Sequence, residues 1–85
     1  MNPKLMKSIV DFAAFLSLSG EDVVQPDAAV EQLEQLASTL KEMTHEDQQI
    51  FVHYINELAR LEGQAGKDKR LTSFLETLPE NLGIV

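Results

Sequence analysis

The sequence has 85 residues, no cysteine and a formal net charge of −7. A chain of this length forms one domain, which we expect to span residues 1–85. Without cysteine it has neither disulfides nor thiolate metal ligands. No apolar run approaches the roughly 20 residues of a membrane-spanning helix. The first apolar segment is interrupted by Lys7 and Asp11, which is unlike a signal peptide. We therefore expect a cytoplasmic protein with no membrane partner.

The negative charge is concentrated in one stretch of the chain. Between Glu21 and Asp47 eight carboxylates are opposed by one base, Lys41, so this stretch carries −7 and the remainder is neutral. Affinity for nucleic acid depends on neutralising phosphates with lysine and arginine. We therefore expect no nucleic-acid partner, and we expect a protein with a basic surface to be the better fit.

Residues 3–18 are predicted to form the first helix. Asn2 is a favoured N-cap residue, and Pro3 suits the first helical position. Gly20 follows the end of this segment and is typical of a helix terminus. Helical spacing predicts one buried stripe on this helix, formed by Leu5, Ile9, Phe12 and Leu16.

Residues 26–43 are predicted to form the second helix, which begins at Pro26. Its leucines recur with helical spacing and indicate a buried stripe. The acidic side chains fall on the opposite side, which we treat as a candidate partner-binding face. Its members are Asp27, Glu31, Glu34 and Glu42.

Residues 45–62 are predicted to form the third helix. Thr44 is a plausible N-cap, supported by Asp47 three residues later. The apolar arc of this segment is wide enough to contact two neighbours, which predicts a central position, and Gly63 is expected to end it. The alternative is one continuous helix over residues 26–62 in a dimeric helical hairpin, because neither glycine nor proline separates the two segments.

Residues 68–78 are predicted to form the fourth helix, with Pro79 ending it. The tail, residues 79–85, is apolar enough to pack back on the body. The resulting fold is an all-α, compact four-helix domain. A basic cluster is expected to be solvated or to pair with the acidic face; it consists of Lys67, Lys69 and Arg70.

Phe15 projects beyond the predicted buried stripe of the first helix. Either the following link or the C-terminal tail covers it, which is the favoured interpretation, or it belongs to an exposed patch. The candidate apolar interface consists of Phe15, Leu18, Val23 and Val24.

No sequence pattern indicates catalysis, a cofactor or a metal. Residues 63–67 lack the spacing, the Ser or Thr and the preceding strand of a phosphate-binding loop. His53 and Glu57 lie one helical turn apart, but a stable metal site needs more ligands. General acid–base catalysis needs a water-poor pocket, and we expect so small a helical domain to lack a cavity of several hundred Å³. We therefore predict no enzymatic activity, no cofactor and no small-molecule substrate.

Acyl carrier proteins share this chain's length, acidity and expected helical form. A carrier needs Asp-Ser-Leu at the start of its acidic helix, where the serine bears the prosthetic arm. The corresponding residues here are Asp27-Ala28-Ala29, and Ser38 follows Ala37 in mid-helix. The sequence therefore argues against a carrier.

The remaining hypothesis is a non-enzymatic protein-interaction module that binds a basic protein partner. An adaptor, or an immunity or antitoxin-like inhibitor of a basic toxin, is a specific version that rests on analogy alone. The alternative is self-association into a homo-oligomeric structural or scaffold protein, driven by the apolar patch around Phe15.

Overall fold

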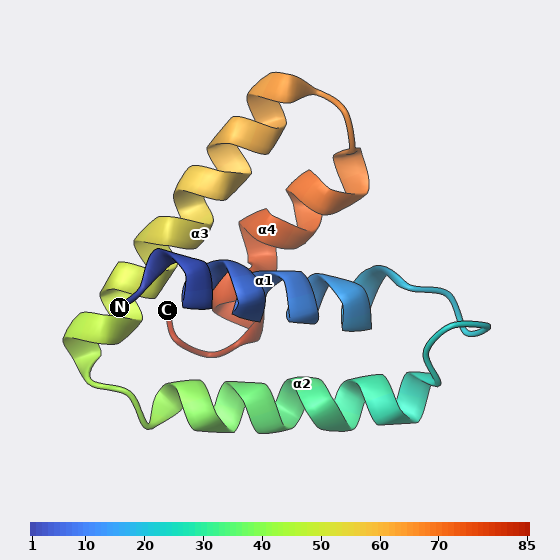
Figure 1. Cartoon of the computed structure of the whole chain (residues 1–85), viewed down its shortest axis with the longest axis horizontal. Coiled ribbons are helices and arrows are strands. Elements are labelled where there is room, and N and C mark those ends of the chain that lie inside the picture. Colours follow the sequence, from blue (N-terminus) through green and yellow to red (C-terminus); the bar gives the residue numbers. More distant parts are fainter.

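The chain folds into four helices and no strand: α1 (Pro3–Leu18), α2 (Pro26–Lys41), α3 (His45–Ala65) and α4 (Lys69–Asn81). A computed structural model describes all of residues 1–85. α1 and α2 form one antiparallel pair, and α3 and α4 form a second (Figure 1). α1 lies across the second pair and contacts all three other helices, whereas the most extensive contact is between α3 and α4. The prediction of an all-α four-helix domain is confirmed.

The junction between α2 and α3 is a sharp corner closed by side-chain hydrogen bonds. Thr44 is the N-cap of α3, and its Oγ1 accepts a hydrogen bond from the backbone N–H of Asp47 at 3.1 Å. The Gln48 Nε2 donates to three backbone carbonyls at the end of α2, those of Leu40 at 3.1 Å, Lys41 at 3.1 Å and Met43 at 3.4 Å. The last carbonyls of a helix have no i+4 partner within it, and here Gln48 supplements the backbone bond from the N–H of Met43 to the carbonyl of Leu40 at 3.2 Å. The alternative of one continuous helix is therefore wrong.

The ends of α2 and α3 differ from the prediction. α2 ends at Lys41, two residues early, and α3 continues through Gly63 to Ala65. A glycine inside a helix costs only about 1 kcal/mol, which packing against α4 offsets. A Cβ built on Gly63 would lie 3.8 Å from Thr72 Cγ2. Gly66, at φ 65°, adopts the left-handed conformation that ends the helix.

α4 also differs from the prediction at both ends. Asp68 is its N-cap, with Oδ1 accepting from two backbone N–H groups at 3.0 and 3.1 Å. Pro79 lies inside the helix, which continues to Asn81. A proline this near a helix end removes one backbone hydrogen bond without stopping the turn. The helix closes in a Schellman motif, in which Gly83 has φ 72° and the N–H of Ile84 donates to the carbonyl of Pro79 at 3.2 Å.

The buried side of α1 is not the predicted stripe. Leu5 is 60% exposed and Phe12 is 44% exposed, whereas Leu16 is buried as expected. The side chains of α1 that face the core are Met6, Val10, Ala13 and Leu16. Apolar residues cover two sides of this helix, so their spacing alone cannot select one. Ala13 is completely buried, and its small side chain allows the close approach of the second helical pair.

One apolar cluster joins all four helices. Its members are Met6, Val10, Ala13, Leu40, Phe51, Ile55, Leu75, Leu78 and Leu82. The two largest fully buried side chains, Phe51 and Ile55, come from α3, although α1 contacts more of the other helices. Leu82 and Ile84 pack against the cluster as expected of the tail, while Val85 is exposed. No polar or charged residue is buried.

Candidate functional site

The acidic face of α2 consists of Asp27, Glu31, Glu34 and Glu42. All four side chains are exposed, and none forms an ion pair. The two ion pairs of the molecule are short-range and lie elsewhere, between Lys7 and Asp11 on α1 and between Glu57 and Arg60 on α3. The acidic face is therefore a solvated surface of uncompensated negative charge.

The two ion pairs shift the pKa values of Glu57 and Arg60 in one pair and of Lys7 in the other. The hydrogen bond from Arg60 lowers the pKa of the Glu57 carboxyl below its ordinary value. The bond to Asp11 raises the pKa of the Lys7 ammonium. Each pair lies within a single helix and is exposed to solvent. These pKa shifts are therefore unlike those of catalytic residues, which arise in water-poor pockets.

The basic cluster at the start of α4 does not pair with the acidic face. Lys67 and Lys69 form no ion pair. Arg70 Nη2 instead donates to the backbone carbonyl of Leu18 at 2.8 Å. This hydrogen bond joins the end of α1 to the start of α4, so Arg70 has a structural partner within the chain.

The four residues of the candidate apolar interface have different surroundings. Phe15 is 50% exposed and Val23 is 62% exposed, so the cover expected over Phe15 is absent. Leu18 is partly buried in a hollow beside α4, and Val24 is partly buried in a separate hollow between α1 and α2. Leu18 and Val24 therefore line two different hollows, while Phe15 and Val23 line neither of them.

A different apolar line runs along α1. Leu5, Phe12 and Phe15 lie at i, i+7 and i+10, within one side of the helix, and all three are exposed. Sequence reasoning assigned Leu5 and Phe12 to the core and so missed this line. The sequence did contain an indication of this line, because Phe15 lies on the same side of the helix as Leu5 and Phe12.

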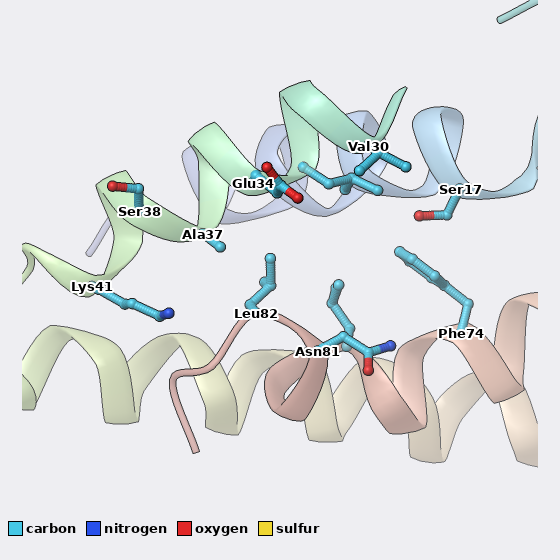
Figure 2. A pocket seen from close by; sticks show the side chains of 11 residues that line it. Ser17, Val30, Glu34, Ala37, Ser38, Lys41, Phe74, Asn81 and Leu82 are labelled. Atoms are coloured by element: carbon cyan, nitrogen blue, oxygen red, sulfur yellow. The ribbon is translucent and has the colours of Figure 1, made fainter. Parts of the chain in front are cut away.

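A cleft of about 610 Å³ separates α2 from α4. We name it the interhelical cleft. Its apolar lining comes from both helices and consists of Val30, Leu33, Ala37, Phe74, Leu78 and Leu82. Polar side chains at its edges are Ser17, Glu34, Ser38, Lys41 and Asn81. Figure 2 shows that α2 and α4 face each other across the gap, with Leu82 and Phe74 projecting from the α4 side. The expectation that this small domain has no such cavity is wrong.

The cleft forms because α2 is held mainly by one neighbour. α2 packs against α1 and makes no extensive contact with α4. Val30 is consequently left 55% exposed at the mouth of the cleft. Sequence reasoning missed the cleft because the lining residues of its two walls lie more than 30 positions apart in the chain.

The cleft has no arrangement typical of catalysis. The hydroxyls of Ser17 and Ser38 line it with two ionisable side chains, Glu34 and Lys41. No histidine accompanies them, and both ionisable side chains are exposed to solvent, unlike the catalytic bases of water-poor pockets. His53 is exposed on α3, and nowhere do three histidine, aspartate or glutamate side chains converge as a metal site would need. What the arrangement offers is apolar surface beside negative charge.

Comparisons with known proteins add no assignment. The chain matches no protein-family model, and no curated protein and no solved structure is significantly similar to it. None of the four helices is both long enough and apolar enough to cross a membrane.

Proposed function

We propose that this protein is a non-enzymatic interaction module whose acidic face binds a basic surface of another protein. One observation carries the proposal. All four carboxylates of the acidic face are exposed without an ion pair, although the chain contains seven lysine and arginine residues. The whole net charge of the chain is thus presented by one stretch that the fold does not neutralise.

Such a face acts chiefly through electrostatic steering and selection of partners. A surface of one sign accelerates association with a surface of the opposite sign and disfavours partners of like charge. Individual exposed ion pairs stabilise a complex weakly, so affinity requires apolar contacts as well. Binding through this face is expected to weaken as salt concentration rises.

A charge-reversal experiment tests the proposal. Glu31→Lys with Glu34→Lys changes the net charge from −7 to −3 and replaces attraction by repulsion on the acidic face. We expect the double variant to fold normally and to lose the partners that the wild-type chain captures from native lysate, as identified by mass spectrometry.

The matched control reverses two exposed carboxylates of α4 that do not line the interhelical cleft. Glu76→Lys with Glu80→Lys gives the same net charge away from the acidic face, and it should retain those partners. Equal capture by both double variants and the wild type would refute the proposal. If both double variants lost the partners equally, binding would depend on the net charge of the chain and not on the acidic face.

Self-association is a second candidate function, supported by the apolar line on α1. Leu5, Phe12 and Phe15 are 60, 44 and 50% exposed on one side of the helix. A dimer that buried this line would remove large apolar side chains from water. Light scattering across a concentration series tests this candidate. A constant monomer mass would exclude it, whereas a mass increase abolished by Phe12→Glu with Phe15→Glu would support it.

A further inference from the structure

The interhelical cleft has the size and lining of an anchor site for side chains of a partner. Its volume of about 610 Å³ lies within the ordinary range of ligand pockets, which are also mostly apolar with a few polar groups. Val30 at its mouth is 55% exposed. An occupant that covered Val30 and Phe74 would remove apolar surface from water on both walls.

The shape of the cleft favours an elongated occupant. The α2 wall extends from Val30 to Lys41, which is about 16 Å at the rise of a helix. That length matches about three turns of a docked helix, whose apolar side chains at i, i+3 or i+4 and i+7 would lie in the cleft. The α4 wall, from Phe74 to Leu82, is shorter, about 12 Å or little more than two turns.

The charges at the cleft select the kind of helix. Glu34 belongs both to the acidic face and to the lining of the cleft, and Glu31 lies one turn away on the same helix. The single cation of the lining, Lys41, is close to α4, since its Nζ lies 3.0 Å from the position of a Cβ on Gly83. It thus stands beside the C-terminal end of α4, where the helix dipole favours a cation. A basic side chain of an occupant would therefore be attracted at the Glu34 edge, where the acidic face adjoins the cleft, and repelled at the Lys41 edge.

We propose that the interhelical cleft binds the apolar side of an amphipathic basic helix of the partner, with Glu34 pairing with a lysine or arginine at its edge. This inference rests on the proposed function and locates the apolar anchors that the acidic face alone lacks. It predicts that affinity depends on the cleft and on Glu34 together.

The test uses the full chain, labelled with ¹⁵N, and a synthetic peptide as probe. The peptide has about 14 residues of leucine, alanine and lysine, with leucines at helical spacing. A control peptide has the same composition in an order without helical period. We expect the amphipathic peptide to bind at least about tenfold more tightly than the control. The amide signals of Val30, Ala37, Phe74 and Leu82 should shift most.

Two variants and one control variant locate the binding. Ala37→Trp fills the cleft, and we expect it to weaken peptide binding by about tenfold or more. Gln35→Trp places the same side chain on the exposed outer side of α2 and should bind as the wild type does. Val30→Asn changes an exposed side chain at the mouth and should weaken binding several-fold with no change in thermal unfolding, so the test survives if Ala37→Trp misfolds.

Several results would overturn the inference. These are equal binding of both peptides, wild-type affinity in Ala37→Trp and Val30→Asn, or signal shifts confined to Asp27, Glu31 and Glu42. No binding of either peptide at millimolar concentration would overturn it too. Shifts at the cleft on raising protein concentration alone would assign it to a second copy. None of these results decides the proposed function, which depends separately on the Glu31 and Glu34 capture experiment.

Discussion

Gln48 is expected to stabilise the corner between α2 and α3, and replacing it with alanine tests this. Its Nε2 donates to the carbonyls of Leu40 and Lys41 at 3.1 Å, and more weakly to that of Met43 at 3.4 Å. Two such hydrogen bonds contribute about 1–3 kcal/mol to the free energy of unfolding. The better helix propensity of alanine offsets a few tenths of a kcal/mol. We expect Gln48→Ala to lower the free energy of unfolding by about 1–2 kcal/mol.

Thermal unfolding followed by circular dichroism measures this loss. For a domain of this size, each kcal/mol corresponds to a shift of about 4–8 °C in Tm. Gln49→Ala is the matched control, because Gln49 is exposed and bonds only to His45 within α3. Its Tm should stay close to that of the wild type. If Gln48→Ala and Gln49→Ala unfold within about 2 °C of each other, the corner does not depend on Gln48 and the reasoning is refuted.

Three further predictions follow from burial, backbone conformation and charge. Phe51→Ala should lower the free energy of unfolding by about 3–5 kcal/mol, because Phe51 is completely buried. Phe12→Ala should lower it by only about 1 kcal/mol, because Phe12 is 44% exposed. Chemical denaturation measures both losses, and equal losses would contradict the observed orientation of α1. Gly83→Ala should cost about 1–2 kcal/mol, since φ is 72° and a Cβ would meet a lysine side chain at 2.7 Å; an unchanged denaturation midpoint would contradict this. Arg60→Gln should raise the pKa of Glu57 toward its ordinary value in an NMR titration. Because the folded pKa is lowered, any stabilisation by this pair is present above the unfolded pKa and is lost as pH falls through the folded pKa; an unchanged pKa would show that the pair does not persist in solution.

The helix starts were predictable because their signals are local. Asn2 and Thr44 were identified as N-caps from the sequence, and both side chains accept the expected backbone hydrogen bonds. Gln25 caps α2 through its Oε1 at 3.1 Å from the N–H of Ala28, and this was missed because glutamine is not a preferred N-cap residue. Because a cap is formed by residues within one helical turn, the local sequence is nearly sufficient to predict where a helix begins.

The helix ends and the buried side of α1 were not predictable in the same way. Gly63 and Pro79 each reduce helix stability locally, yet α3 and α4 continue past them because the two helices pack extensively against each other. On α1, both Met6 and Leu5 belong to plausible apolar stripes. Only the position of the second helical pair decides that Met6 is buried and Leu5 is exposed.

The two surfaces of the candidate site differ in the same way: one was predictable from the sequence and the other was not. The acidic face was located from sequence, because carboxylates at helical spacing opposite a leucine stripe must lie together on the exposed side of one helix. The interhelical cleft was decided by tertiary structure alone, since it exists only where α2, held by α1, stands apart from α4. Helical periodicity therefore determined where the charge lies on this protein. Contacts between distant segments determined which apolar side chains lie beside that charge. Glu34 shows the result, because it belongs both to the acidic face and to the lining of the interhelical cleft.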